Sequence, residues 1–473
     1  MSTSPPTGER FLVIGGCGFL GHNLAGALLK RGEANVHILD VRLPPAELLL
    51  EKVTYHTSDI TDFAGLSQAF AQIQPQAVFH TASPLPGVPR DVMEKVNVIG
   101  TANIVEAAKS NAVRKLVFTS SASVVFTGED LIYGDERLPL PDNVFDAYSD
   151  TKGRAEKIVL NANTPDLEDN KVPKTGLRTA AIRPAGIFGP SDRQALPGFF
   201  NTLALGRTNV QIGNNENLFD WTYVDNVTHA HILASDKLET SGYSVSFLSS
   251  VHLLPVLGAD EKDFDRGVPT SEKRPSVLGA TDYARKLPST LSASSREETL
   301  NVRPVVRGKY DQFFHLVHPD VASPGSPLPE VPLSSEYIPI AGEAFFVTNG
   351  QPMPFWDFPR ALWAQASPKF AADSASGKKP WVMSKAMGLF FAGWAKTYGW
   401  ATGKEVQLSK FNVTFTCTTR YYNIERARRV LGYEPVVGMK EAIRRSTEWW
   451  LSTLDGQAFQ AQESGRRVAR AEN

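Results

Sequence analysis

Cysteine is nearly absent from the sequence, which has only Cys17 and Cys417 among 473 residues. Two cysteines so far apart offer neither a disulfide framework nor a cluster with metal-ligand spacing, so no metal site is expected and a reducing compartment is favoured. Net charge is absent too, because 49 basic side chains offset 50 acidic ones and leave -1. No global field therefore recruits nucleic acid, and a small-molecule partner fits better.

Long apolar runs are also missing. The richest stretch, residues 381–400, contains Lys385, Lys396 and several glycines. It falls short of the roughly 20 predominantly apolar residues that a membrane-spanning helix needs. Two interpretations stay open, a core helix and an interfacial helix or lid over an apolar substrate. The first ten residues lack an apolar core, which predicts neither a secretory signal nor a transit helix and favours the cytosol.

What the first half does contain is an alternation of short β-branched runs with helical patterns. Strands are expected at 11–14, 36–40, 77–80, 115–119 and 179–183, and helices at 22–31 and 97–110. Continuous apolar runs of this length suit a parallel sheet covered on both faces. The alternation therefore predicts an α/β fold, a doubly wound parallel-sheet Rossmann domain followed by a smaller C-terminal substrate lobe.

Composition divides the rest of the chain. The stretch from 241 to 340 is filled with Ser, Pro and charge, which predicts a largely disordered, low-complexity insertion. Helical patterns return at 423–431 and 439–450. The expected organisation is a disordered N-terminus (1–9), a cofactor-binding domain with the catalytic site (10–240), the insertion (241–340), a substrate-binding lobe (341–455) and a polar tail (456–473).

A glycine loop follows the first expected strand. Gly15, Gly18 and Gly21 recur at intervals of three and open a helix, with Phe19 and Leu20 between the last two. The first glycine permits a tight turn, the second lets backbone amides approach a pyrophosphate, and the third allows close packing of helix on strand. The helix N-terminus then offers N–H groups to phosphates. This pattern predicts dinucleotide binding, since a strand precedes it and a helix follows.

Acidic residues follow the next two strands. Asp40 ends the second strand, at the distance from which a carboxylate reaches the adenosine ribose hydroxyls. Its charge would repel a 2′-phosphate, so NAD is favoured, while Arg42 keeps NADP open as an alternative. Asp40 has a second interpretation as a strand-end cap. Asp59, followed by Ile60, is assigned to the adenine.

A catalytic pair is expected at Tyr148 and Lys152, which share one helix face because they are four positions apart. An ammonium beside a phenol favours the phenolate, so the lysine should lower the tyrosine pKa toward neutrality. Ser121 follows an expected strand at the carboxyl edge of the sheet, where such folds bind ligands. We predict that Ser121 contacts the reacting oxygen, with Ser120 and Ser123 as alternatives.

In this order the residues resemble the extended short-chain dehydrogenase/reductase superfamily, and most closely its 3β-hydroxysteroid dehydrogenase branch. The resemblance covers about 10–237 and 341–452 and is carried by GGCGFLGHNL, HTASP, FTSSASVVF, AYSDTKGRAE, RPAGIFGP, FDWTYVDNVTHAHILA, GEAFFVTNGQPMPFWDF and RYYNIERARRVLGYEP. It adds to the expected cofactor-binding positions Thr81, Ala82, Ser83, Asn97, Pro184 and Ile187, together with Tyr148 and Lys152. The stretch 241–340 has no counterpart in the family, and it is either a lineage-specific loop or translated non-coding sequence.

The resemblance implies oxidation of the 3β-hydroxyl of a 4α-carboxysterol in ergosterol (sterol) biosynthesis. Tyr148 would remove the hydroxyl proton, Ser121 would hold the oxygen, and Lys152 would tune the tyrosine and anchor the nicotinamide ribose. NAD, or alternatively NADP, would accept hydride, and the β-keto acid would lose CO2. The family also implies peripheral association with the cytosolic face of the endoplasmic reticulum beside other sterol-pathway enzymes, with a soluble cytoplasmic protein as second choice, and a homodimer.

Three alternatives remain at the level of sequence. A 3β-hydroxysteroid dehydrogenase acting on another steroid or triterpenoid would use the same residues. A nucleotide-sugar epimerase or dehydratase would keep NAD bound throughout its cycle, although HTASP and the aromatic C-terminal lobe favour an apolar substrate. A cofactor-binding sensor or scaffold would keep the glycine loop but would not need Tyr148 and Lys152.

Overall fold

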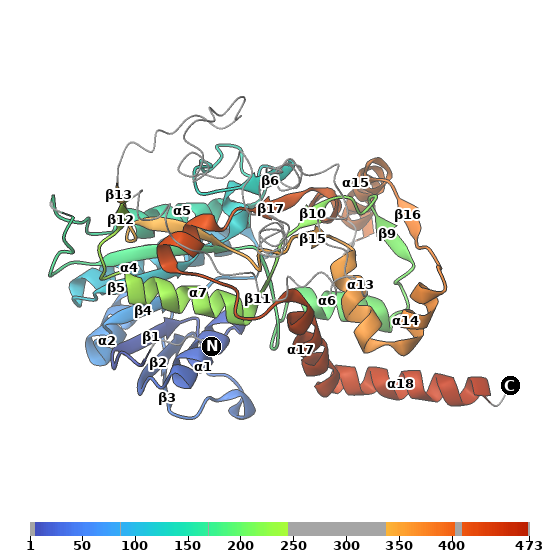
Figure 1. The fold of residues 1–473 in the computed structure, drawn as a ribbon, viewed down its shortest axis with the longest axis horizontal. Helices are drawn as coiled ribbons and strands as arrows, with labels where there is room; N and C mark the ends of the chain where they lie inside the picture. Colours follow the sequence, from blue (N-terminus) through green and yellow to red (C-terminus); the bar gives the residue numbers. More distant parts are fainter. Residues whose placement is uncertain (1–4, 86, 169, 245–336, 403–408, 472–473) are drawn as a thin grey trace, which may run out of the picture.

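The computed structural model describes residues 5–85, 87–168, 170–244, 337–402 and 409–471. A sheet of seven parallel strands lies at its centre, in the order β14-β7-β5-β4-β1-β2-β3 (Figure 1). The strands are β1 (Arg10–Ile14), β2 (Asn35–Asp40), β3 (Val53–Thr57), β4 (Ala77–His80), β5 (Lys115–Thr119), β7 (Arg178–Pro184) and β14 (Glu343–Val347). The predicted parallel sheet is thus confirmed.

Helices cover both faces of this sheet. One face carries α1 (Phe19–Arg31) and α7 (Val224–Lys237), and the other carries α2 (Phe63–Ile73), α4 (Thr101–Ser110) and α5 (Ala147–Asn161). Successive side chains of a strand point to opposite faces. Phe11 and Val13 therefore enter the core under α1 and α7, whereas Leu12 and Ile14 enter the core under the other helices. The fold therefore has one hydrophobic core on each face of the sheet, as a doubly wound fold requires.

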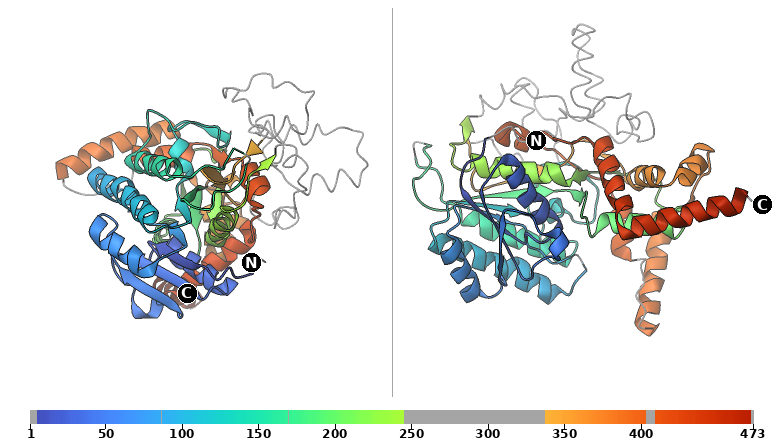
Figure 2. Two further views of the ribbon diagram at one scale, coloured as in Figure 1. Left: turned by 90° about the vertical axis from the view of Figure 1, so that its left-hand side faces the viewer. Right: turned by 90° about the horizontal axis from the view of Figure 1, so that it is seen from below.

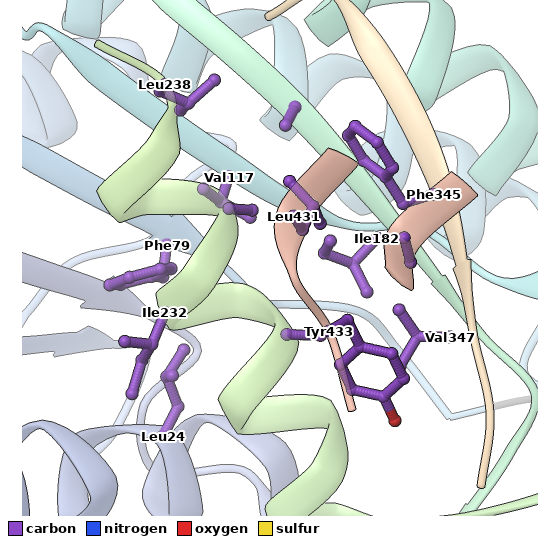
Figure 3. Packing of buried hydrophobic residues seen from close by; sticks show 14 of the residues in the cluster. Leu24, Phe79, Val117, Ile182, Ile232, Leu238, Phe345, Val347, Leu431 and Tyr433 are labelled. Atoms are coloured by element: carbon purple, nitrogen blue, oxygen red, sulfur yellow. The ribbon is translucent and has the colours of Figure 1, made fainter. Parts of the chain in front are cut away.

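Figure 3 shows the first of these cores from close by. Leu24 from α1 and Ile232 from α7 lie beside Phe79 and Val117 of the sheet, and all four side chains are buried. At about 25 cal/mol per Å² of buried apolar surface, each such side chain contributes roughly 1.5–3 kcal/mol. This packing fixes the carboxyl edge of the sheet, on which the expected site residues lie.

Several element boundaries differ from expectation. The helix expected from residue 22 already begins at Phe19, because the glycine loop leads directly into its first turn. It ends at Gly32, whose φ of 97° gives the left-handed cap that favours glycine. The helix expected at 97–110 starts earlier, with the π-helical turn η2 (Glu94–Gly100) running into α4.

The edge strand β14 is the main departure from the expected domain boundaries. Residues from 341 onward are expected in the substrate lobe, whereas β14 pairs in parallel with β7 and completes the Rossmann sheet. Four of its five residues are buried, as a strand inside an α/β sheet requires. Chain from beyond the expected insertion therefore belongs to the cofactor-binding half.

The second lobe packs an aromatic core beside this sheet. Its four-stranded sheet has the order β15-β10-β17-β6, and Phe200 stacks on Trp450 with ring centroids 4.0 Å apart. Its strands are β6 (Leu131–Gly134), β10 (Leu218–Phe219), β15 (Met353–Pro354) and β17 (Arg420–Tyr422), with β8 (Gly186–Phe188) paired to β11 (Trp221–Tyr223) and β9 (Val210–Ile212) to β16 (Trp381–Met383). Its helices are α6 (Ala195–Ala204), α13 (Asp357–Ala366), α14 (Pro368–Ala375), α15 (Lys385–Thr402), α16 (Lys410–Cys417), α17 (Met439–Ser452) and α18 (Leu454–Ala471).

Short turns complete the described elements: η1 (Ala46–Leu48), α3 (Arg90–Met93), η3 (Ala122–Val125) and η6 (Ala427–Leu431). Of the helix expected at 423–431, regular turns begin only at residue 425. The expected polar tail forms most of α18. Figure 2 shows α15 lengthwise, extending away from the body of the molecule. None of the helices in the described ranges is long and apolar enough to cross a membrane.

The expected insertion and N-terminus are only partly described. Residues 245–336 lie outside the described residues, but β12 (Tyr243–Ser244) and β13 (Tyr337–Ile338) pair in antiparallel fashion and bring the two ends of the insertion together. At the N-terminus, the backbone N–H groups of Thr7 and Gly8 donate to the Glu33 carboxylate at 2.9 and 3.1 Å. The disorder expected for residues 1–9 does not extend to these two positions.

Candidate active site

The glycine loop connects β1 to α1 at very short contact distances. Gly15 has a φ of 79°, and a Cβ added there would lie 2.6 Å from the backbone of Ala82. A Cβ on Gly21 would lie 2.4 Å from the Gly15 carbonyl oxygen, while the Gly18 N–H donates to that oxygen at 3.0 Å. Only glycine fits at the first and third positions, because a side chain there would push α1 or β4 away.

The first turn of α1 is open to an anion. Gly18 is its N-cap residue and supplies no side-chain hydrogen bond to the N–H groups of the turn. Free N–H groups at a helix N-terminus attract phosphate. Phe19 and Leu20 lie in this turn, and Leu20 packs with Ile187 of β8 and with Val224 of α7. The loop, with no room for a Cβ and an uncapped helix end, fits the pyrophosphate of a dinucleotide.

Asp40 is fixed against this loop. Its Oδ2 accepts a hydrogen bond from the Cys17 N–H at 3.0 Å, and its Oδ1 accepts one from the Val41 N–H at 2.8 Å. Burial, with the Asp40 carboxylate second, raises the pKa of the Cys17 thiol to about 12, so this thiol stays protonated at neutral pH. Asp40 therefore places a carboxylate at the end of β2. It also caps the end of this strand, which is the second interpretation that the sequence allows.

Asp59 and Ile60 face different surroundings although they are adjacent. Asp59 is exposed, and its Oδ1 accepts a hydrogen bond from the Thr61 N–H at 2.8 Å. Ile60 is buried, and a Cβ on Gly100 would lie 2.7 Å from its side chain. Asp59 thus exposes its carboxylate to solvent beside the end of β3, whereas Ile60 belongs to the core.

The segment after β4 supports the glycine loop from the other side. The Thr81 hydroxyl donates to the Ile14 carbonyl oxygen at 2.9 Å, and Ala82 is the residue that Gly15 approaches. Ser83 instead donates to the Pro84 carbonyl oxygen at 3.2 Å. Thr81 and Ala82 therefore shape the loop, and Ser83 lies one step beyond it.

Asn97 and Pro184 lie on neighbouring elements of the same edge. Asn97 is buried in η2, where its Nδ2 donates to the Thr151 hydroxyl of α5 at 3.0 Å. Its Oδ1 is buried with no hydrogen-bond partner among the described residues. Pro184 ends β7 opposite Val347 of β14. An unsatisfied buried amide oxygen is costly, which makes Asn97 a candidate to accept from a ligand or water.

Ser121 and Tyr148 meet at the carboxyl end of β5. A hydrogen bond joins their hydroxyls, and the Ser121 Oγ also lies 2.9 Å from the Ser123 Oγ. Tyr148 is in the first turn of α5, which Asp146 caps by accepting from the Ser149 N–H and hydroxyl at 2.9 and 3.0 Å. Of the three candidate serines, Ser121 contacts the tyrosine, whereas the buried Ser120 hydroxyl has no partner in the described ranges.

Lys152 lies one turn further along α5 and is fully buried. Its Nζ donates to the Thr119 carbonyl oxygen at 2.6 Å and lies 4.5 Å from the centre of the Phe118 ring. Burial lowers the lysine pKa to about 7, and the Glu156 carboxylate opposes part of that shift. Burial therefore disfavours the charged form of Lys152.

The pKa of Tyr148 moves in the opposite direction from that expected. Burial raises it to about 12, although the hydrogen bond with Ser121 lowers it in part. Desolvation penalises the phenolate, the Asp146 carboxylate raises the tyrosine pKa further, and the Lys152 amino group donates to the Thr119 carbonyl oxygen. The expectation that Lys152 lowers the tyrosine pKa toward neutrality is therefore not met.

Sequence reasoning missed the buried charges behind the lysine. Arg183 of β7 makes two hydrogen bonds to the Glu156 carboxylate, at 2.8 and 2.6 Å. His231 of α7 lies 2.7 Å from the Thr119 hydroxyl, and burial lowers its pKa to about 4. Glu156 lies one helical turn after Lys152, and this spacing is the one signal in the sequence that points to a buried carboxylate here. Its partner Arg183 is on a separate element and leaves no local pattern.

Comparison with known proteins gives consistent matches. The profile of the 3-beta hydroxysteroid dehydrogenase/isomerase family matches residues 12–249. The decarboxylating sterol-4-alpha-carboxylate 3-dehydrogenase of Schizosaccharomyces pombe is 33% identical, with 93% of this chain and 96% of that protein covered. The enzyme of the same name from Saccharomyces cerevisiae is 31% identical, covering 93% and 97%. These matches confirm the resemblance found in the sequence.

Solved structures agree on the fold. UDP-glucose 4-epimerase of Thermotoga maritima superposes with a TM-score of 0.54 at 15% identity, covering 94% of this chain and 99% of that one. An enzyme of Bordetella bronchiseptica, solved in complex with NAD+, gives a TM-score of 0.53 at 15% identity, covering 94% and 98%. At such identities the likeness establishes the architecture and leaves the substrate to the site itself.

Proposed function

Because the chain belongs to the 3-beta hydroxysteroid dehydrogenase/isomerase family, we propose that it oxidises the 3β-hydroxyl of a 4α-carboxysterol with NAD, and that the product loses CO2, as a step of sterol biosynthesis. The observation that carries the reaction type is the meeting of Ser121, Tyr148 and Lys152 at the carboxyl end of β5. The names of the fungal relatives support the substrate.

The residues divide the chemistry as follows. The Tyr148 oxygen takes the proton of the 3β-hydroxyl, and the Ser121 hydroxyl donates a hydrogen bond to the same substrate oxygen. When bound, NAD supplies the acceptor for the hydride that leaves C3. C3 becomes a carbonyl, and the 4α-carboxylate is then β to a ketone. The bond from C4 to the carboxylate breaks, its electron pair passes into the enolate, CO2 leaves, and C4 takes up a proton.

Proton transfer to Tyr148 makes the reaction dependent on pH. Burial raises the tyrosine pKa to about 12, so its deprotonation is uphill at neutral pH. The phenolate fraction of Tyr148 increases as pH rises. Because the raised pKa lies above pH 9, this increase continues across the whole range from pH 6 to 9. We therefore expect kcat for sterol oxidation to rise between pH 6 and 9, and a flat profile would contradict the role of Tyr148 as base.

The cofactor preference follows from Asp40. Its carboxylate lies at the end of β2 beside the glycine loop, where it favours ribose hydroxyls and repels a 2′-phosphate. Replacing Asp40 by Asn removes the charge and keeps one acceptor oxygen, which serves either the Cys17 N–H or the Val41 N–H group. The ratio of kcat/KM for NADP to that for NAD should rise about tenfold or more, as loss of a like-charge repulsion predicts. An unchanged ratio would remove Asp40 from cofactor selection.

A substrate panel tests the proposal. Purified protein is assayed with a 4α-carboxysterol, a neutral 3β-hydroxysteroid and a UDP-sugar, each with NAD and NADP, and both NADH release and CO2 are measured. We expect NADH and CO2 in equal amounts from the sterol acid. Turnover of a UDP-sugar without NADH release would indicate an epimerase instead. Tyr148→Phe should keep cofactor binding and lose at least about 100-fold in kcat, and undiminished turnover would refute the catalytic assignment.

We also propose that α15 rests on a lipid surface. Met387, Phe390, Phe391 and Trp394 share one helix face and are 40–66% exposed, and Lys385 begins the same helix. An exposed apolar face with basic flanks suits the boundary of a membrane that holds a sterol substrate. The protein would then act from the cytosolic face of the endoplasmic reticulum as a peripheral protein.

Vesicle flotation tests this surface. Wild-type protein should float with vesicles of phosphatidylcholine and phosphatidylserine, and the double variant Phe390→Ser/Trp394→Ser should lose most of that binding. Leu454→Ser is the matched control, because Leu454 is 84% exposed on α18 at a distance in sequence from α15. Equal loss in the control, or none in the double variant, would refute the assignment.

A further inference from the structure

The substrate lobe buries an arginine inside an aromatic box. Arg420 of β17 is 4% exposed. Its guanidinium carbon lies 4.2 Å from the ring centre of Phe126, 4.9 Å from that of Phe219 and 4.1 Å from that of Phe415. The three rings come from the segment after η3, from β10 and from α16. The rings stabilise a cation over their faces but accept no conventional N–H hydrogen bonds.

The guanidinium makes no ion pair with any of the described residues. Its Nε and Nη2 are buried with no hydrogen-bond partner in the part of the chain that the structure describes. Asp146 favours its charged form from a distance, but that carboxylate already accepts two hydrogen bonds from Ser149. Burial lowers the arginine pKa to about 10, so the group keeps its charge at neutral pH. A buried, unpaired cation is unfavourable, and a well-placed anion offsets part of that cost.

Arg420 lies beside both segments that carry the hydroxyls of the active site. Tyr422 lies on the same strand as Arg420, and its hydroxyl donates to the Ala122 carbonyl oxygen at 3.1 Å, directly after Ser121. The Phe126 ring of the box packs edge-on against Phe145 at 4.8 Å, three residues before Tyr148. Arg420 is thus connected through its strand to the segment of Ser121, and through Phe126 and Phe145 to the segment of Tyr148.

We propose that Arg420 binds the carboxylate of the substrate and thereby selects a sterol acid over a neutral sterol. The inference rests on the proposed function, since it assigns a residue to one group of that substrate. Two free N–H groups on a planar guanidinium match the two oxygens of a carboxylate, and desolvation strengthens the pairing. The surrounding rings supply the apolar surface that a sterol skeleton needs. Arg420 is a specificity-determining residue that takes no part in proton or hydride transfer.

The test compares an acid with a matching neutral substrate. For Arg420→Gln, kcat/KM for the 4α-carboxysterol should fall roughly 100-fold, because a buried charged partner is lost. The value for the same 3β-hydroxysterol without the carboxylate should change less than about threefold, since that sterol makes no such contact. Arg420→Lys should restore part of the loss, because it returns the charge without the planar fork. Equal losses on both substrates, or no loss on the acid, would overturn the proposal.

Binding measurements separate this proposal from the proposed reaction. Quenching of tryptophan fluorescence gives the Kd of the 4α-carboxysterol for wild-type protein and Arg420→Gln, whether or not turnover occurs. If the wild type binds the acid and the variant binds it roughly 100-fold more weakly, the arginine assignment stands even when no NADH forms. Equal affinity would refute it. Unchanged NAD affinity in the variant verifies that it folds.

Discussion

Replacing Lys152 by methionine should make the protein inactive and, at neutral pH, more stable. The lysine is fully buried, and burial lowers its pKa from 10.5 to about 7. In the unfolded chain the same side chain keeps its ordinary pKa. Folding at pH 7 therefore disfavours the protonated form of this group, and this lowers the free energy of unfolding. The cost comes with placing a lysine at the proposed active site.

The size and sign of the effect follow from linkage. Each unit of pKa corresponds to about 1.4 kcal/mol, so the penalty at pH 7 is about 4 kcal/mol. Methionine relieves it but loses the hydrogen bond to the Thr119 carbonyl oxygen and the contact with the Phe118 ring, together about 2 kcal/mol. A net gain of about 2 kcal/mol remains. A group with a lowered pKa in the folded state loses its penalty as pH rises from about 7 toward 10.5, and by pH 9 the gain should vanish.

Urea denaturation at pH 7 and pH 9 measures the difference in unfolding free energy between variant and wild type. Lys157→Met is the matched control, because Lys157 is on the same helix but exposed. The control should change stability by less than about 0.5 kcal/mol at both pH values. A Lys152→Met difference that stays constant between pH 7 and 9 would refute the account of a lowered pKa, whatever its sign.

Three further predictions concern the cofactor loop and the buried charges. Gly21→Ala places a Cβ 2.4 Å from the Gly15 carbonyl oxygen and should raise the Kd of NAD at least about tenfold by calorimetry, whereas Gly26→Ala, where a Cβ meets nothing within 4 Å, should leave it unchanged. Glu156→Gln breaks the buried pair with Arg183 and should cost about 3–5 kcal/mol of unfolding free energy, against less than about 1 kcal/mol for Glu94→Gln, whose partner Arg154 is exposed. Burial raises the pKa of Asp220 from 3.8 to about 7. Wild-type stability therefore falls as pH rises through that window, and the unfolding free energy of Asp220→Asn should gain up to about 4 kcal/mol relative to wild type between pH 4 and pH 8. A pH-independent gain would contradict this.

Local patterns allowed much of the N-terminal half to be predicted from sequence. The strands β4 and β5 have the expected bounds because each has a short apolar run at its centre, as burial on both faces of a parallel sheet favours. The glycine loop was readable because steric contact permits glycine alone at Gly15 and Gly21. The spacing of Tyr148 and Lys152 needed only the period of a helix.

Properties that depend on distant parts of the chain could not be predicted in this way. The edge strand β14 pairs with β7 across the whole expected insertion, and no local periodicity specifies a partner that far away. The direction of the Tyr148 pKa shift depends on how completely other elements exclude water from α5. A charge pair such as Glu156 with Arg183 joins a helix to a strand, so its members are recognisable only once the fold brings them together.

Local patterns predict the reaction type, whereas recognition of the substrate depends on distant parts of the chain. The hydroxyls of Ser121 and Tyr148 and the ammonium of Lys152 would serve any sterically suitable alcohol, with a bound nicotinamide supplying the hydride acceptor. Selection of an acid requires a cation, and Arg420 supplies one next to these segments, on a strand that follows them by more than 250 residues. On the proposed assignment, the C-terminal lobe recognises the carboxylate and the Rossmann half performs the redox step. Exchange of β17 between relatives should therefore alter the preference for acidic over neutral sterols while leaving cofactor affinity unchanged.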